Sequence, residues 1–324
     1  MKAVIHKKYG GPEVLQIVEV AKPSPKDNEV LVKISATTVT ATEATFRKGK
    51  PYFTRLFTGI FSPKIETLGE EIAGKIESIG KDVDAFKIGD KVFGTAGPEF
   101  GGNAEYLCVA QNEVLTAMPK DLSYEEAASS VDGFLTALPF LRDTGNIKSG
   151  DKVLIYGASG SVGVGAVQVA KIFGAKVTAV CSHSNFELVK SIGADEVINY
   201  KKDDFTKNGE KYDIIFDTVG KITFSKSKVS LSKQGVFLEA GISIGILPHV
   251  ILSLIFPGKK AKIAATGLRL PKERKKDLIL LKGFLESKKI IPVIDKQYDL
   301  NEISDAHAYV DLGHKKGNVT ISIG

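Results

Sequence analysis

A glycine-rich turn between an apolar run and a helix constrains this sequence more than any other feature. Val153-Leu154-Ile155-Tyr156 leads directly into Gly157-Ala158-Ser159-Gly160-Ser161-Val162-Gly163, and helical spacing follows over residues 162–173. The pattern predicts a strand, a tight turn and a helix in succession. A pyrophosphate must closely approach the backbone N–H groups at such a helix start, which a glycine at 160 permits, and a glycine at 163 lets the helix pack on the strand.

The residues around the turn decide its meaning, because Ala158 replaces the first glycine of the G-x-G-x-x-G pattern. Alone, A-x-G-x-x-G is ambiguous, and a turn that binds nothing is the alternative. Near-continuous apolar strands predict a parallel sheet covered by helices on both faces, and right-handed crossovers then give a doubly wound Rossmann domain. The further expected strands are at 176–180, 196–199, 213–216, 235–238 and 262–266, with a helix at 185–192.

The first part of the chain has a different pattern of apolar and polar residues, and the whole chain is long enough for two domains. Its length of 324 residues exceeds the size at which one hydrophobic core usually stops growing, about 250–300 residues. Period-two alternation predicts a β-rich first domain, and Ser123 followed by Glu126 is a capping-box pattern for a helix over 124–141. A helix over 272–287 and a strand over 318–323 are expected to return to the first domain. The expected boundaries are 1–122, 123–265 and 266–324.

The residues after the second strand bear on which dinucleotide is bound. Folds specific for NAD usually place an Asp or Glu about 20 residues beyond the glycines, where it holds the ribose 2′-OH. Residues 181–185 here read Cys-Ser-His-Ser-Asn, so no carboxylate repels a 2′-phosphate, and Ser182, His183 and Asn185 offer hydrogen-bond donors. This favours NADPH over NADH. The alternative for His183 is an exposed loop histidine without a ligand.

Composition and charge argue against several other classes of protein. The chain has 44 Lys and Arg against 38 Asp and Glu, and two cysteines. The basic residues are dispersed with few aromatic neighbours, so we expect no nucleic-acid partner. The longest apolar stretch, 244–256, is interrupted by Pro248 and His249 and is shorter than the roughly 20 residues that span a bilayer, so we expect no membrane partner. The distant cysteines and the lack of a signal-peptide pattern favour a cytoplasmic protein.

Further motifs occur in a definite order along nearly the whole chain. They are Lys2-Ala3-Val4, Tyr9-Gly10-Gly11-Pro12-Glu13-Val14-Leu15, Leu68-Gly69-Glu70-Glu71-Ile72-Ala73-Gly74, residues 83–94, Gly101-Gly102-Asn103-Ala104-Glu105-Tyr106, residues 133–138, Gly193-Ala194-Asp195, residues 197–200 and Asp217-Thr218-Val219-Gly220. In number and order they resemble the medium-chain dehydrogenase/reductase superfamily, and specifically its zinc-independent quinone oxidoreductase branch.

The resemblance implies an α/β protein with a GroES-like β-rich catalytic domain, made from both chain ends, and an inserted Rossmann NADP-binding domain. It places the active site in the cleft between the two domains, and it implies a homodimer, for which we expect an edge strand near Lys262 to Arg269. The adenosine and pyrophosphate half is expected to contact Ser159, Gly160, Ser161, Val162, Ser182, His183, Asn185 and Tyr200. The nicotinamide half is expected to approach Val219, Ala240, Gly241 and Asn318.

Two departures from related sequences affect the chemistry. Zinc-dependent alcohol dehydrogenases carry a Cys and a His where this chain has Thr40 and Glu70, so no catalytic zinc is expected, and two cysteines cannot make a four-cysteine site. Quinone oxidoreductase relatives usually show Asn-Pro-x-Asp where this chain reads Thr40-Ala41-Thr42-Glu43. We expect Thr40 and Tyr52 to donate hydrogen bonds to the acceptor oxygen. Packing roles are the alternative for both, and Glu43 is expected to orient structure.

These inferences predict an NADPH-dependent reductase of quinones or α,β-unsaturated carbonyls that works without zinc. Hydride chemistry belongs to the nicotinamide, so the protein has to align it and stabilise the charge that arrives on oxygen. A metal-free reductase of other carbonyls or enoyl thioesters is a second candidate. A protein that binds NADPH without turnover, as a structural element or sensor, is the candidate outside enzymology.

Overall fold

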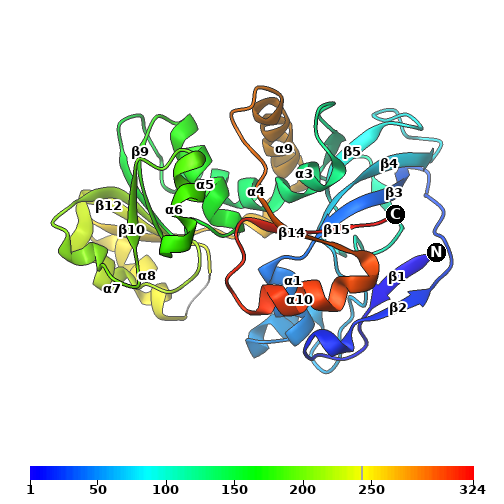
Figure 1. The fold of residues 1–324 in the computed structure, drawn as a ribbon, viewed down its shortest axis with the longest axis horizontal. Helices are drawn as coiled ribbons and strands as arrows, with labels where there is room; N and C mark the ends of the chain where they lie inside the picture. The colour runs from blue at the N-terminus through cyan, green and yellow to red at the C-terminus, as the bar shows by residue number, and fades with distance from the viewer. Residues whose placement is uncertain (242–243) are drawn as a thin grey trace. The chain divides into compact units, whose positions relative to one another are not determined.

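The computed structural model describes residues 1–241 and 244–324, and the chain divides into two compact units. Unit 1 comprises Met1–Val131, Leu270–Glu286 and Pro292–Gly324, and unit 2 comprises Asp132–Arg269 and Ser287–Ile291. Both ends of the chain therefore belong to unit 1 (Figure 1). Each unit is described below by itself.

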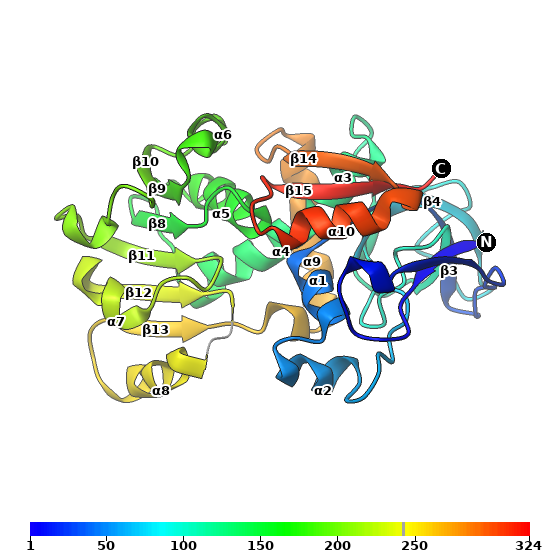
Figure 2. The ribbon, with the colours of Figure 1, turned by 60° about the horizontal axis from the view of Figure 1, so that its bottom comes forward.

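Unit 2 contains a parallel sheet with helices around it, as the apolar runs predict. The sheet has six strands in the order β10-β9-β8-β11-β12-β13, and every neighbouring pair is parallel (Figure 2). Its strands are β8 (Lys152–Tyr156), β9 (Lys176–Cys181), β10 (Glu196–Asn199), β11 (Tyr212–Asp217), β12 (Leu231–Glu239) and β13 (Lys260–Ile263). Its helices are α4 (Val131–Pro139), α5 (Ser161–Ile172), α6 (Phe186–Ser191), α7 (Phe224–Ser227) and α8 (Leu247–Ile255). Successive residues Val153, Leu154 and Ile155 are all buried, which confirms that both sheet faces are covered.

Unit 1 is built on a mixed sheet that the C-terminal residues complete, in which β14 and β15 are parallel and the other pairs are antiparallel. Seven strands follow the order β14-β15-β3-β4-β5-β7, with β6 also paired to β3, and β1 and β2 form a separate hairpin. Its strands are β1 (Lys2–Ile5), β2 (Gln16–Glu19), β3 (Glu29–Thr38), β4 (Glu71–Ile79), β5 (Lys91–Thr95), β6 (Tyr106–Ala110), β7 (Leu115–Ala117), β14 (Ile294–Asp299) and β15 (Asn318–Ser322). Its helices are α1 (Ala41–Lys48), α2 (Arg55–Thr58), α3 (Tyr124–Ser129), α9 (Pro271–Glu286) and α10 (Ile303–Asp311). One core holds Val4 together with Val319 and Ile321, so the two chain ends stabilise each other.

The units differ in their limits from the expected domains, for identifiable reasons. Ser123 and Glu126 form the predicted capping box, but the helix that they begin, α3, packs on β3, β4 and β15 and so belongs to unit 1. Residues 287–291 belong to unit 2, and the Gln168 side chain holds the last of them, Ile291. Its Nε2 donates to the Ile291 carbonyl at 3.2 Å, and its Oε1 accepts from the Ile291 N–H at 2.7 Å.

Two details of the expected elements are wrong. The helix expected over 124–141 is two helices followed by a π-helical turn at Phe140–Thr144, and Pro139, which has no N–H to donate, ends α4. The edge strand ends at Ile263, because Thr266–Leu268 turns as a 3₁₀ helix, so no strand continues to Arg269. Helix α10 and strand β14 were not anticipated. Among the described residues, no helix has both the length and the apolar character needed to cross a bilayer.

Helices α4 and α5 of unit 2 approach each other closely at Gly133 and Gly165, and a substitution at Gly165 tests this contact. A Cβ added at Gly165 would lie 2.5 Å from the Gly133 carbonyl oxygen, whereas one added at Gly283 of α9 meets nothing within 4 Å. Gly165→Ala is therefore expected to lower the free energy of unfolding by about 1–3 kcal/mol, through overpacking. Gly283→Ala is expected to raise it by up to about 1 kcal/mol, through helix propensity. Urea unfolding measures both, and a Gly165→Ala variant as stable as the parent contradicts the packing argument.

Candidate functional site

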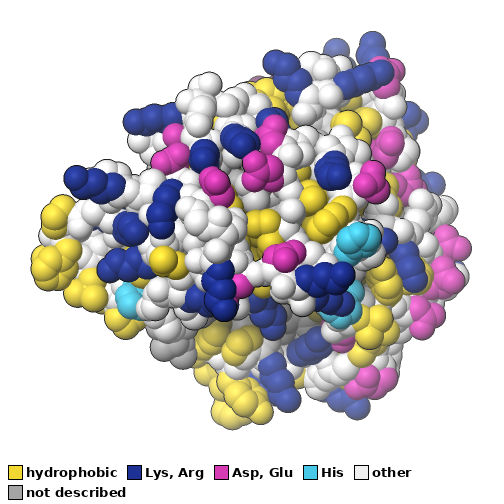
Figure 3. Space-filling view, turned by 60° about the vertical axis from the view of Figure 1, so that its left-hand side comes forward, with side chains coloured by type: hydrophobic (Ala, Val, Ile, Leu, Met, Phe, Trp, Pro, Cys, Tyr) yellow, Lys and Arg dark blue, Asp and Glu magenta, His cyan; other side chains and the backbone are white. Residues whose placement is uncertain are grey.

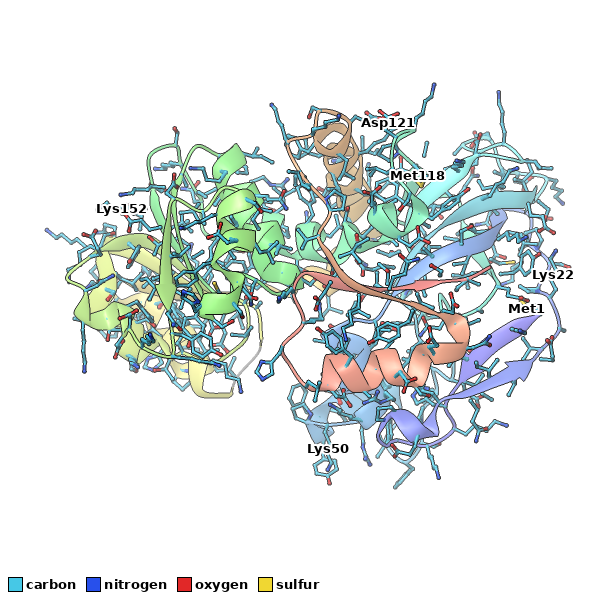
Figure 4. The ribbon with its side chains drawn as sticks, viewed as in Figure 1. Met1, Lys22, Lys50, Met118, Asp121 and Lys152 are labelled. Carbon is cyan, nitrogen blue, oxygen red and sulfur yellow. The ribbon has the colours of Figure 1, made fainter. Side chains whose placement is uncertain are left out.

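The predicted glycine turn joins β8 to α5 and leaves the start of that helix without a side-chain cap. Lys152, labelled in Figure 4, begins β8. At the other end of this strand, the Gly157 and Ala158 N–H groups donate to the Val180 carbonyl of β9 at 3.0 and 3.1 Å. Gly160 is the N-cap of α5 and makes no side-chain capping bond. The N–H groups of the first turn of α5 thus remain available to an anion.

Two glycines of the turn are required by close backbone contacts. Gly157 has a φ of 80°, in the region that favours glycine. A Cβ added at Gly163 would lie 2.2 Å from the Gly157 carbonyl oxygen, so α5 can approach the strand only because residue 163 has no side chain. At Gly160 an added Cβ would lie 3.6 Å from that oxygen, an ordinary contact. Gly160 therefore matters for what approaches the turn from outside, and not for how the turn folds.

Two of the predicted cofactor residues contact each other directly. The Asn185 side chain, buried at the start of α6, donates from Nδ2 to Ser159 Oγ at 2.8 Å. This bond ties the glycine turn to the segment that follows β9. Ser161 Oγ, two residues further along the chain, donates to Asp132 Oδ2 at 3.4 Å. The remaining residue of this part, Val162, is the second residue of α5.

The residues after β9 and β10 are polar and lie near the carboxyl edge of the sheet. Ser182 Oγ is 3.1 Å from Ser184 Oγ, and the exposed His183 ring lies 5.1 Å from that of Phe186. Tyr200 lines a pocket of about 240 Å³ together with residues that the sequence reasoning did not single out as a group. The other lining residues are Tyr156, Val180, Lys201, Lys202, Asp203, Asp204, Phe205, Ile222 and Lys226. Their shared position beyond the strand ends is the signal that identifies them.

Asp217 organises the loop after β11, a role that the sequence reasoning missed. Its buried carboxylate accepts hydrogen bonds from the backbone N–H groups of Val219 at 3.0 Å, Gly220 at 2.9 Å and Ile222 at 2.8 Å. Burial raises the pKa of Asp217. The Val219 side chain packs over Gly157, and the Ala240 N–H donates to the Asp217 carbonyl at 2.9 Å. Val219 and Ala240 thus lie in loops at the same sheet edge as the glycine turn, and the exposed Gly241 directly follows Ala240.

In unit 1, Thr40 and Glu43 form a reciprocal cap at the start of α1. Thr40 Oγ1 accepts from the Glu43 N–H at 3.1 Å, and Glu43 Oε2 accepts from the Thr40 N–H at 2.9 Å. The second carboxylate oxygen, Oε1, accepts from the Gly69 N–H at 2.6 Å and from Asn103 Nδ2 at 3.1 Å. Glu43 is fully buried, and burial raises its pKa to about 8. The structure therefore supports an orienting role for Glu43.

Tyr52 and Asn318, the other two predicted site residues of unit 1, differ from each other in burial. Tyr52, two residues after the Lys50 labelled in Figure 4, is 68% exposed, and the Arg55 guanidinium lies 5.0 Å from the centre of its ring. Asn318 begins β15, is buried, and donates from Nδ2 to the Val293 carbonyl at 3.2 Å. Both belong to unit 1. Within the described part of the chain, no hydrogen bond joins either residue to Thr40.

No set of three or more His, Cys, Asp or Glu side chains in residues 1–241 and 244–324 is arranged to hold a metal ion. Cys108 and Cys181 are free thiols, and burial raises the pKa of both, to about 11 for Cys181. Thiolates are the form of cysteine that binds zinc. These two protonated thiols therefore do not fit the ligands of a zinc site.

The burial of Glu43 predicts how the free energy of unfolding varies with pH. The folded pKa of about 8 lies above the ordinary 4.5, so between these values the folded chain holds a proton that the unfolded chain has released. The contribution of Glu43 to stability is complete below about pH 4.5 and falls as pH rises to about 8, by up to about 1.4 kcal/mol per pH unit.

Glu43→Gln removes this titration. The variant is expected to be less stable than the parent near pH 5, because the Gln amide opposes the Thr40 N–H, and the difference is expected to shrink towards pH 8. Glu302→Gln is the matched control, since Glu302 forms an exposed capping box with Asp299. Urea unfolding across this pH range measures both, and a Glu43→Gln difference that does not vary with pH contradicts the prediction.

Comparison with known proteins identifies the family. The family model described as "Alcohol dehydrogenase GroES-like domain" matches residues 26–120, and that described as "Zinc-binding dehydrogenase" matches residues 192–321. Over 337 residues the chain is 33% identical to "Quinone-oxidoreductase homolog, chloroplastic" of Spinacia oleracea, covering 99% of this chain and 98% of that protein. It is 30% identical over 333 residues to "NADPH-dependent alkenal/one oxidoreductase, chloroplastic" of Arabidopsis thaliana, covering 99% and 79% respectively.

A solved structure agrees with these sequence matches. The structure titled as Escherichia coli quinone oxidoreductase complexed with NADPH aligns with a TM-score of 0.84 at 25% identity, covering 99% of this chain and 100% of that one. The parallel-sheet unit, the GroES-like unit and the end-to-end matches together confirm the resemblance drawn from the motifs. The chain belongs to the quinone oxidoreductase branch of the medium-chain dehydrogenase/reductase superfamily.

Proposed function

We propose that this chain is an NADPH-dependent, zinc-independent oxidoreductase that reduces quinones or α,β-unsaturated carbonyls. The observation that carries the proposal is the uncapped start of α5, with Gly160 at its N-cap. A helix N-terminus of this kind binds phosphate through its N–H groups and its dipole. The names of the Arabidopsis and Escherichia coli relatives, which mention NADPH, support the same cofactor.

The preference for NADPH rests on the charge around the adenosine half. After β9 come Ser182 and His183, and the pocket lined by Tyr200 also contains three lysines and two aspartates, which are Lys201, Lys202, Lys226, Asp203 and Asp204. Of these lysines, Lys226 already pairs with Asp204 at 3.4 Å. We propose that Ser182, His183, Tyr200 and the exposed Lys201 and Lys202 receive the 2′-phosphate. The absence of an Asp or Glu in residues 182–186 removes the group that would repel it.

The proposed catalytic residues act as neutral donors towards the acceptor oxygen. When bound, the reduced nicotinamide supplies the hydride. Thr40 Oγ1 accepts from the Glu43 N–H, which fixes the hydroxyl while its own hydrogen is free to donate to a substrate oxygen. We propose Thr40 as the principal donor and Tyr52, which is exposed, as the second. Asn318, Val219, Ala240 and Gly241 are proposed to border the nicotinamide.

Substituting Gly160 separates binding from folding. Gly160→Ala adds a Cβ in ordinary contact with its neighbours, at 3.6 Å from Gly157 O, but places it where phosphate approaches. We expect an unchanged urea midpoint and a Kd for NADPH raised at least about tenfold, which corresponds to about 1.4 kcal/mol. Nicotinamide fluorescence measures the Kd, and NADH is titrated in parallel. Tighter binding of NADH than of NADPH by the parent overturns the cofactor assignment.

Substrate class and catalytic role are tested by turnover. A panel of quinones, enones, simple ketones and an enoyl thioester is assayed for NADPH consumption, and quinones or enones are expected to react fastest. Thr40→Val should lower kcat by roughly 100-fold, the usual effect of losing one oxyanion donor, while Thr40→Ser, which keeps the hydroxyl, should retain most activity. Tyr52→Phe should cause a smaller loss. Saturable NADPH binding with no turnover on any acceptor would favour a binding protein instead of an enzyme.

A homodimer and a cytoplasmic location remain predictions from the sequence. The strand expected to pair with its copy is β13, at one of the two edges of the six-stranded sheet. Its four residues, Lys260–Ile263, form a shorter edge than expected. The printed name of the spinach relative places that protein in the chloroplast.

A further inference from the structure

Arg274 of helix α9 forms a largely buried ion pair with Glu70, and both residues belong to unit 1. Arg274 Nη2 lies 3.6 Å from Glu70 Oε1, and the two side chains are 16% and 21% exposed, respectively. On the face of the molecule drawn in Figure 3, by contrast, Lys and Arg side chains project into solvent. Removing a guanidinium from water is costly unless a partner or a ligand compensates for the loss. The position of Arg274 therefore calls for a function.

Glu70 lies beside the capped start of α1. The residue before it, Gly69, donates its N–H to Glu43 Oε1 at 2.6 Å, and Glu43 Oε2 accepts from the Thr40 N–H at 2.9 Å. The charge of Glu70 also contributes to the raised pKa of Glu43, which shows that the two carboxyl groups lie near each other. An unbroken series of contacts thus connects the Thr40 cap to Arg274.

Helix α9 holds Arg274 in place from the other side. Leu278, one turn further along the helix, is fully buried, and Lys275 Nζ donates to the Gln111 carbonyl at 2.7 Å. The guanidinium is therefore presented by a helix that is fixed on unit 1. It has five N–H donors in a planar fork, and a carboxylate such as that of Glu70 can accept two of them in the best geometry. The fork thus has more donors than Glu70 can use.

The charges of this cluster suit a ligand that becomes negative during a reaction. Because the pKa of Glu43 is about 8, this carboxyl group is neutral near pH 7. Arg274 and Glu70 then supply one positive and one negative charge. Glu70 offsets the cost of burying the guanidinium before the reaction and orients it. A hydrogen bond from an oriented guanidinium to an oxyanion is about twice as strong as one between neutral groups.

We propose that Arg274, oriented by Glu70, donates a hydrogen bond to the acceptor oxygen beside Thr40 and stabilises the negative charge that forms there. The proposal rests on the reductase activity proposed above. When hydride adds to the conjugated carbon of the acceptor, the displaced π electrons move to the carbonyl oxygen. This oxygen is then an enolate or phenolate until water protonates it. Thr40 donates a neutral hydrogen bond, whereas Arg274 supplies the positive charge.

Steady-state reduction of a quinone and an enone tests the assignment. Arg274→Ala should lower kcat by roughly 100-fold, the usual effect of losing one oxyanion donor, while the Kd for NADPH stays unchanged. Arg274→Lys keeps the charge without the fork and should lose less. Lys276→Ala is the matched control, because Lys276 lies on the same helix, pairs with Glu273 and is 62% exposed. This control should react like the parent. Equal kcat for Arg274→Ala and the parent overturns the proposal.

A double variant separates a direct contact from the effect of the Glu70 charge. Arg274→Ala removes the cation that offsets Glu70, and the carboxylate would then disfavour a negative oxygen nearby. Glu70→Gln/Arg274→Ala should nevertheless remain at least about tenfold slower than Glu70→Gln alone. Equal rates for these two variants mean that Arg274 acts only by offsetting Glu70, and the proposal is wrong. The urea midpoint of each variant is measured, and Arg274→Gln, which keeps more of the apolar stem, replaces Arg274→Ala if that variant is destabilised.

A stable phenolate distinguishes failure of this proposal from failure of the proposed function. para-Nitrophenolate is titrated by its absorbance with NADP+ present. Arg274→Ala should bind it at least about tenfold more weakly than the parent, and Lys276→Ala should bind it equally well. If the parent reduces quinones but Arg274→Ala binds the phenolate as tightly as the parent, this proposal is wrong and the proposed function stands. If the parent reduces no acceptor, the proposed function is wrong, and weaker phenolate binding by Arg274→Ala still supports an oxyanion site at Arg274.

Discussion

The close approach of backbone segments around the glycine turn is the constraint on which unit 2 depends. Because Gly163 has no side chain, α5 can begin against the end of β8. A Cβ added at this residue would lie only 2.2 Å from the Gly157 carbonyl oxygen. Gly133 and Gly165 repeat this device between α4 and α5. As a result, the free N–H groups at the start of α5 lie at the carboxyl edge of the sheet. The loops after β9, β10 and β11 begin at the same edge. The absence of side chains that allows this packing also leaves room for the proposed phosphate at the start of α5.

Unit 1 depends on a buried carboxyl group in a comparable way. Glu43 accepts hydrogen bonds from three separate segments, at Thr40, Gly69 and Asn103. A side chain that satisfies these donors fixes the Thr40 hydroxyl relative to the loops around it. The replacement of the Asn-Pro-x-Asp pattern of relatives by Thr40-Ala41-Thr42-Glu43 therefore keeps a capped helix start and a carboxyl at the same place in the chain.

The parts of the structure that sequence could predict were those encoded by neighbouring residues. The strand and helix around residues 152–173, and the capping box at Ser123, follow from local periodicity and local hydrogen bonds. The burial of Glu43 depends on Asn103, 60 residues away, and the pocket at Tyr200 depends on four strands ending at one edge. The apolar run that contains α8 was visible, but the lack of any buried residue in this helix was not, because exposure is decided by what the rest of the fold leaves uncovered.

The bond between Gln168 and Ile291 means that unit 2 is not a single stretch of chain. Its last five residues, Ser287–Ile291, lie between α9 and β14 of unit 1. A fragment that ended at Arg269 would therefore lose the partner of the Gln168 amide, and a graft of this nucleotide-binding unit onto another protein would need two junctions at its carboxyl side.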